Sequence, residues 1–168
     1  MEISDAPNVL EIRKILYATD FSRHATHGFQ YAITLSKHFQ ARMTILHAIS
    51  LPPTIPADPT GGVALTDYFE ELEEESKARL QEMLDQTRNH GVEAETLLVD
   101  GAPHKVILQE AKRLGVDLIV VGTHGRKGVE HLLLGSTAEK IVRQSPVPVL
   151  VVRHPQHSGD GGMTLLLV

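Results

Sequence analysis

Short apolar runs alternate with longer helical patterns along most of this chain. The apolar runs predict strands at residues 12–19, 43–49, 94–99, 117–121 and 147–152. Between them, apolar residues recur at helical spacing, which predicts helices from Ser22 to Phe39, from about Leu65 to His90, from Pro103 to Leu114 and from Ser136 to Gln144. Because strand and helix alternate four times and close on a strand, the pattern predicts a parallel sheet with helices on both faces.

Residues at the ends of these segments agree with the predicted boundaries. Ser22 suits the N-cap of the first helix, and Pro103 suits the first residue of the third. Gly91 and Gly115 stand where the second and third helices should stop. Residues 51–62 contain four prolines and two glycines, which predicts a long loop before the second helix.

Length and composition restrict the classes of protein that this chain can belong to. Its 168 residues suit one domain, and the absence of cysteine excludes disulfides and thiolate metal sites. A net charge of -5, with no Trp, three Tyr and four Phe, argues against a nucleic-acid binder. The N-terminus lacks the pattern of a signal peptide, and no apolar run reaches the length of a membrane span. We therefore expect a cytoplasmic protein.

A glycine-bearing stretch follows the fourth predicted strand. Gly122-Thr-His-Gly125 is separated by nine residues from Gly135-Ser136-Thr137, where the fourth helix begins. Glycines let a ligand approach the backbone closely, and a helix N-terminus offers unpaired N–H groups to phosphate. Ligands of such folds bind at the carboxyl ends of the strands, which Asp20 and Gly122 occupy in the predicted arrangement. The stretch indicates a nucleotide site, although Gly122 and Gly125 could also be simple turn glycines.

Four segments together carry a family resemblance. They are Lys14-Ile-Leu-Tyr-Ala-Thr-Asp20-Phe-Ser22, Met43-Thr-Ile-Leu-His-Ala48, the glycine stretch with its G-x2-G-x9-G-[S/T] spacing, and Val147-Pro-Val-Leu-Val-Val-Arg153. In this order they resemble the ATP-binding branch of the universal stress protein family, over roughly residues 10–153. The resemblance implies a single-domain, Rossmann-like α/β fold with five parallel strands in the order 3-2-1-4-5.

The same resemblance implies a bound adenine nucleotide, ATP together with Mg²⁺. Thr19 and Asp20 would lie at the adenosine end, and Ala48 would offer backbone hydrogen bonds to the adenine. Gly122, His124 and Gly125 would line the ribose and phosphates. Gly135, Ser136 and Thr137 would hold the phosphates at the helix start. Any Mg²⁺ would arrive with the ATP and lie near Asp20, because a carboxylate touching phosphate directly would be repelled.

Two of these residues also have structural interpretations. Ser136-Thr-Ala-Glu139 has the pattern of a capping box, so the Ser136 hydroxyl could serve the helix start. Asp20 could be a helix N-cap or an ordinary loop carboxylate. The histidine pairs His24/His27 and His154/His157 lack a third ligand nearby in sequence, so we expect no protein-only metal site.

The sequence therefore predicts a nucleotide-binding domain over residues 1–153 and a flexible tail over 154–168. ATP would act as a regulatory or structural ligand of a stress-response homodimer. The dimer would form through the last strand (Val149, Leu150, Val151 and Val152), which we expect at an edge of the sheet. Pro146 and Pro148 could instead protect that edge. Slow ATP hydrolysis and a nucleotide-independent adaptor remain the alternatives, and no catalytic residue can be named.

Overall fold

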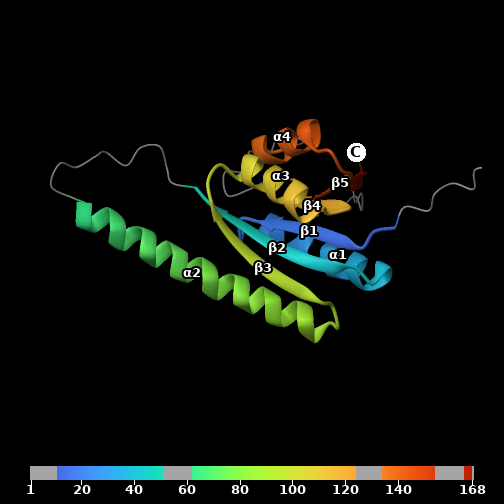
Figure 1. Cartoon of the computed structure of the whole chain (residues 1–168), viewed down its shortest axis with the longest axis horizontal. Helices are drawn as coiled ribbons and strands as arrows, with labels where there is room; N and C mark the ends of the chain where they lie inside the picture. The colour runs from blue at the N-terminus through green and yellow to red at the C-terminus, as the bar shows by residue number, and fades with distance from the viewer. Residues whose placement is uncertain (1–10, 51–61, 124–133, 154–164, 168) are drawn as a thin grey trace, which may run out of the picture.

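The computed structural model describes residues 11–50, 62–123, 134–153 and 165–167 (Figure 1). Six strands of this part form one sheet in the order β3-β2-β1-β4-β5-β6. Their bounds are β1 Lys14–Thr19, β2 Arg42–Ile49, β3 Ala94–Asp100, β4 Leu118–Gly122, β5 Val149–Val152 and β6 Leu165–Leu167. Neighbouring strands among β1 to β5 are parallel. The predicted order 3-2-1-4-5 is therefore confirmed.

Within the described residues, four helices cover the two faces of the sheet. They are α1 Arg23–Phe39, α2 Gly62–Asn89, α3 Pro103–Leu114 and α4 Ser136–Gln144. Figure 1 shows α3 and α4 together on one side of the strands and α2 along the other. The core is accordingly split in two. Phe29 of α1 and Leu80 of α2 share one cluster with Tyr17, while Ile107 of α3 and Ile141 of α4 share the other.

The alternation of side chains along each strand explains this division. Ile15 and Tyr17 of β1 face the α1/α2 side, whereas Leu16 and Ala18 face the α3/α4 side. All four are buried. A strand buried on both faces needs an unbroken apolar run, which is how β1, β4 and β5 appear in the sequence.

The helix boundaries follow the local signals in the sequence closely. The Ser22 hydroxyl accepts a hydrogen bond from the Ala25 N–H at 3.3 Å, as an N-cap should. Pro103 is the first residue of α3, and Gly115 ends it with a φ of 60°. Gly91 follows α2 with a φ of +77°. The predicted start of α2 near Leu65 was wrong, because the helix begins at Gly62.

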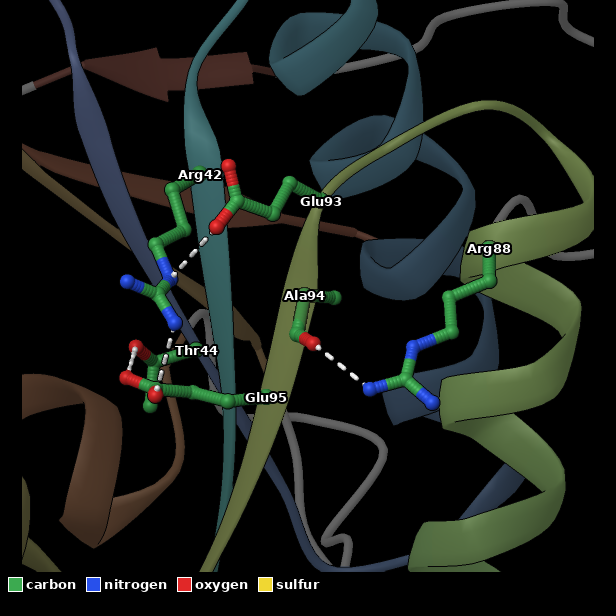
Figure 2. Close-up of polar contacts among 6 residues, drawn as sticks. All are labelled: Arg42, Thr44, Arg88, Glu93, Ala94 and Glu95. Atoms are coloured by element: carbon green, nitrogen blue, oxygen red, sulfur yellow. Dashed lines mark hydrogen bonds and ion pairs between the residues drawn. The ribbon is translucent and has the colours of Figure 1, made fainter.

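Charged side chains mark the β3 edge of the sheet (Figure 2). Arg42 of β2 reaches Glu93 at 3.5 Å and Glu95 at 3.2 Å, and Thr44 donates to Glu95 at 3.2 Å. From α2, the Arg88 guanidinium donates to the Ala94 carbonyl at 3.4 Å. Charges on an edge strand disfavour pairing with another sheet, so this edge is protected.

The opposite edge departs from the prediction. We expected β5 to be the edge strand, but β6 pairs with it in the antiparallel direction, with Val151 opposite Leu166. The expectation was wrong because the fold returns the end of the chain to the sheet. The rest of the predicted tail, residues 154–164 and 168, lies outside the described part. Its flexibility remains a prediction.

Helix α1 approaches β4 closely at Gly28. A Cβ added there would lie 3.4 Å from a ring carbon of Tyr17, 3.7 Å from the Gly122 nitrogen and 3.8 Å from the Val121 carbonyl carbon. These are ordinary van der Waals distances for a methyl group, but they leave no room for a larger side chain. Gly28 therefore sets how closely α1 packs behind the carboxyl end of β4.

We predict that Gly28→Ala stabilises the protein, by about 0.5–1 kcal/mol, because glycine is costly inside a helix and the added methyl group fits. Chemical denaturation of both proteins measures the difference. Gly28→Leu is the contrasting variant and should destabilise, since its side chain would push α1 from the sheet. A stability loss in Gly28→Ala would show that the approach is tighter than these distances indicate.

Candidate functional site

The ends of β2, β1 and β4 bring several predicted residues to one edge of the sheet. Ala18 pairs with Val121 in the β1–β4 register, so Thr19 and Gly122 come next on adjacent strands. Thr19 also pairs with His47, and Ala48 lies one residue further along β2. The strand order reverses between β1 and β4, because β2 lies on the other side of β1. Sheets of this kind bind ligands at such a point.

The turn after β1 fixes the orientation of Asp20. One Asp20 carboxylate oxygen accepts a hydrogen bond from the Ser22 N–H at 3.0 Å, and the Thr19 hydroxyl accepts one from the Phe21 N–H at 3.0 Å. Thr19 is buried and Asp20 half-buried. Asp20 is therefore not the N-cap of α1, a role that Ser22 takes. Its carboxylate is instead held by the turn at the carboxyl end of β1.

Two residues that sequence reasoning missed also shape this turn. Phe21 has a φ of 61°, in the left-handed region that a bulky residue rarely adopts. Its ring lies 4.2 Å from that of buried His47, and the Arg79 guanidinium lies 5.4 Å from its centre. The His47 Nδ1 donates to the Thr19 carbonyl at 2.7 Å. No pattern in the sequence signals these contacts, because they join β1, β2 and α2.

The start of α4 is tied directly to the end of β4. The Gly135 N–H donates to the Thr123 carbonyl at 2.6 Å, and the Thr123 N–H donates to the Val152 carbonyl at 3.0 Å. Gly122 and Gly135, which are far apart in the sequence, are thus brought to one place. Gly135 occupies the N-cap position, and no side chain caps this helix.

The capping-box interpretation of Ser136 is therefore wrong. Ser136 is the first residue of α4 rather than its N-cap, and its side chain is exposed. Gly135 takes the cap position because its extended backbone, with φ −70° and ψ 156°, turns the chain into the helix. Without a side-chain cap, the first N–H groups of α4 are left for water or a ligand.

Basic side chains lie near the N-termini of α3 and α4. The pKa of His104 is lowered, first by partial burial and then by the positive charges of Lys140 and Lys105. Lys140, the fifth residue of α4, therefore lies near the first turn of α3. The predicted residues His124 and Gly125, like the flanking Arg126 and Lys127, lie outside the described part of the chain.

A separate cleft opens on the α1/α2 side of the sheet. It has a volume of about 390 Å³ and is lined by Tyr17, Thr19, Phe21, Thr26, Phe29, Arg79, Glu82, Met83 and Gln86. Burial raises the pKa of the Tyr17 phenol well above its ordinary value, and the Tyr17 hydroxyl donates to the Ala25 carbonyl at 2.6 Å. Thr19 is the one predicted site residue in this lining. The cleft is thus distinct from the region formed by Gly122 and α4.

Two further observations concern the described residues as a whole. Within the described ranges, no group of three or more His, Asp or Glu side chains is arranged to hold a metal ion. Over the same residues, no helix is long and apolar enough to cross a membrane.

The edge near Gly122 has the features of a site for a small anionic ligand. Backbone N–H groups at the start of α4 suit negative charge, and Lys140 adds a positive charge nearby. Ala48 packs against the buried core on the α3/α4 side, which includes Ala18, Val121 and Ala138, so the end of β2 has an apolar side. Fold and site together define an open α/β protein whose candidate ligand site lies at the strand-order reversal.

Sequence comparison identifies the family. The universal stress protein family matches residues 11–153. Universal stress protein MJ0531 of Methanocaldococcus jannaschii is 32% identical over 144 residues, covering 86% of this chain and 84% of the relative. The chain belongs to the universal stress protein family.

Solved structures agree with this assignment. The structure of MJ0577, from the same archaeon, matches with a TM-score of 0.76 at 28% identity. The match covers 87% of this chain and 99% of the MJ0577 chain. A universal stress protein solved in complex with cAMP has a TM-score of 0.62 at 24% identity, covering 85% and 98%. At that identity the second likeness concerns the fold alone.

Proposed function

We propose that this protein binds an adenine nucleotide, ATP with Mg²⁺, as a regulatory or structural ligand. The observation that carries the proposal is the 2.6 Å hydrogen bond from the Gly135 N–H to the Thr123 carbonyl. It sets the uncapped start of α4 beside the carboxyl end of β4. This assignment places the protein in the ATP-binding branch of its family, over a nucleotide-binding domain of residues 1–153.

Each predicted residue has a distinct role in the proposed complex. Asp20 and Thr19 bind at the adenosine end, and the backbone of Ala48 hydrogen-bonds the adenine. Gly122, together with His124 and Gly125, lines the ribose and phosphates. The backbone N–H groups of Gly135, Ser136 and Thr137 bind the phosphates, as helix N-termini commonly do.

Charge explains why a cation should accompany the nucleotide. The chain carries a net charge of -5, so a triphosphate approaches against the overall field. Each interaction with a helix dipole contributes only about 0.3–1 kcal/mol, so several N–H groups, Lys140 and Mg²⁺ must act together. The Asp20 carboxylate beside them would be repelled by bare phosphate. It fits a Mg²⁺ ligand or a ribose acceptor.

Binding is proposed in preference to catalysis. Among the described residues at this edge, Asp20 and His47 could transfer a proton, but each makes a contact that fixes its neighbours in the turn. We therefore assign no catalytic base. Slow hydrolysis and a nucleotide-independent adaptor are the alternatives.

Titration calorimetry with ATP and Mg²⁺ tests the proposal, together with mass spectrometry of nucleotides released from gently purified protein. We expect saturable binding and recovery of ATP. Release of AMP with steady turnover would favour the hydrolase, and no detectable binding would favour the adaptor.

We predict that Asp20→Asn weakens binding of Mg²⁺-ATP by about ten- to a hundredfold, because a charge-assisted interaction contributes about 1.5–3 kcal/mol. Asparagine keeps an oxygen that can accept from the Ser22 N–H, so the turn and the stability should persist. Calorimetry with and without Mg²⁺ separates the two roles. A loss confined to Mg²⁺ conditions indicates a metal ligand, and an equal loss in both indicates a ribose acceptor.

The matched control is Asp117→Asn. The Asp117 carboxylate accepts from the Arg13 N–H at 2.8 Å and the Lys14 N–H at 2.9 Å, at the opposite end of β1. This variant should lose some stability while ATP affinity stays unchanged. An Asp20→Asn protein with wild-type affinity in both conditions would remove Asp20 from the proposed site.

We also propose that the functional assembly is a homodimer joined through Val149, Leu150, Val151 and Val152 of β5. Support comes from the wholly apolar character of this strand, whose outer edge β6 covers in the single chain. Light scattering over a range of concentrations tests the assembly. The cytoplasmic location remains a prediction, which cell fractionation would check.

A further inference from the structure

Phe21 holds a left-handed backbone conformation that its bulky side chain disfavours, with a φ of 61°. Among the described residues, Gln40 is the other residue apart from glycine with a positive φ, and it ends α1, where left-handed residues are common. Phe21 instead lies between the end of β1 and the start of α1, so no helix end explains its conformation. Strain of this kind persists only where the surrounding structure imposes it, and it gathers at functional sites.

Contacts from β2 and α2 hold the side chain of Phe21 in place. Its ring centre lies 4.2 Å from that of buried His47, which belongs to β2. The Arg79 guanidinium of α2 lies 5.4 Å from the same ring centre, within the range of a cation–π contact, and pairs with Glu75 at 2.8 Å. The half-buried ring also packs against the core cluster of the α1/α2 side. These ring contacts offset the backbone strain.

The backbone of Phe21 determines the position of the Asp20 carboxylate. The hydrogen bond from the Ser22 N–H to that carboxylate, at 3.0 Å, spans Phe21 and therefore depends on its dihedral angles. The Phe21 N–H itself donates to the Thr19 hydroxyl at 3.0 Å. Because His47 contacts the Phe21 ring and also donates to the Thr19 carbonyl, the turn is held from the side of β2 as well. A change in the φ of Phe21 would thus move two residues of the proposed nucleotide site.

We propose that Phe21 is a positioning residue of the nucleotide site and that, through Arg79, it makes the ATP affinity depend on where α2 lies. The ring contacts keep the backbone of Phe21 left-handed, and that backbone sets the Asp20 carboxylate toward the ligand. A movement of α2 that withdraws Arg79 would weaken the ring contacts and lower the affinity. By linkage, bound nucleotide would favour the observed position of α2. The inference rests on the part of the proposed function that assigns Asp20 to the nucleotide site.

Two full-length variants, Phe21→Ala and Phe21→Gly, separate the backbone conformation from the presence of the ring. Both lose the ring and its contacts. Alanine still disfavours a positive φ, so without those contacts the turn should relax. Glycine adopts a positive φ freely, so the turn and its hydrogen bond between Asp20 and Ser22 should persist. If the ring touched the nucleotide or only filled space, the two variants would lose the same affinity.

Titration calorimetry with Mg²⁺-ATP measures the affinity of the three proteins. We expect Phe21→Ala to bind about tenfold more weakly than wild type, and Phe21→Gly to stay within about threefold of it. Chemical denaturation without nucleotide measures the strain separately. Phe21→Gly should be more stable than Phe21→Ala, the reverse of the usual order of glycine and alanine, because only glycine is free of strain at a positive φ.

Arg79→Gln tests the link to α2. In the wild-type background it should lower the ATP affinity by about threefold, the worth of an exposed cation–π contact. In the Phe21→Gly background it should have no effect, because glycine needs no ring contacts to hold the turn. Such non-additivity identifies two residues that act through one another. The matched control is Lys77→Gln, on the same helix, whose ammonium group pairs with Glu73 at 2.7 Å. It should leave the affinity unchanged in both backgrounds.

The possible failures are distinguishable. Equal affinity losses in Phe21→Ala and Phe21→Gly would overturn the role of the backbone, and wild-type affinity in Phe21→Ala would remove Phe21 from the site. An equal effect of Arg79→Gln in both backgrounds would overturn the link to α2. In each of these cases wild-type protein still binds ATP. A wild-type protein that binds no ATP would instead contradict the proposed function, and this inference would fall with it.

Discussion

Replacing Gly135 with valine should abolish ATP binding while the fold survives. Gly135 has φ −70° and ψ 156°, a conformation that valine adopts without strain. The added side chain would occupy the space that phosphates need beside the first N–H groups of α4. We expect affinity to fall by about a hundredfold or more, equivalent to about 2.7 kcal/mol. Calorimetry measures the affinity, and circular dichroism confirms the fold.

Ala102→Val is the matched control for this variant. Ala102 is the N-cap of α3, with φ −66° and ψ 120°, and like Gly135 it begins a helix that has no side-chain cap. Valine is a poorer N-cap than glycine, so Gly135→Val should also lower the free energy of unfolding by about 1 kcal/mol. Unchanged ATP affinity in a folded Gly135→Val protein would contradict the proposed site.

Ile141→Ala should lower the free energy of unfolding by about 2–5 kcal/mol, the usual cost of emptying a fully buried isoleucine site. Ile141 is fully buried and packs α4 onto the sheet, in the core cluster that also contains Val149 and Val151 of β5. The loss is large beside a total stability of about 5–15 kcal/mol. Urea denaturation gives the value, and Val142→Ala, at a half-buried position of the same helix, should cost less.

The same variant also tests how α4 is coupled to the ligand. A ligand that binds the native state alone raises stability, by about 2.7 kcal/mol at a hundredfold excess over its dissociation constant. Saturating Mg²⁺-ATP should therefore recover part of the stability lost in Ile141→Ala, seen as a rise in Tm. If ATP gives no rise in either protein, the nucleotide does not bind the folded domain.

Local signals in the sequence predicted the elements and their ends well. Helix ends depend on contacts between residues only a few positions apart. Ser22 caps the first N–H groups of α1, Pro103 begins α3 and Gly115 ends it. The strand order 3-2-1-4-5 also agreed. The role of Ser136 was predicted less well, because Ser136-Thr-Ala-Glu139 fits a capping box in sequence although Gly135 takes the cap in space.

The sequence also predicted some residues of the candidate site and missed others. The sequence indicated Asp20, Gly122 and Gly135 through residue type and spacing. It gave no sign that Phe21 would take a left-handed conformation against His47 and Arg79. Those contacts join three elements that are distant in the chain, so no local pattern carries them.

By itself, the sequence determined the alternation of strand and helix, the helix ends, the family resemblance and the residues suited to a nucleotide. These depend on periodicity and on interactions between near neighbours. Only the tertiary structure decided that Gly135 bonds to Thr123, that Gly28 brings α1 close to β4, and that β6 covers β5. Such pairings depend on how distant segments meet, and three leucines near a chain end do not specify which edge they will join.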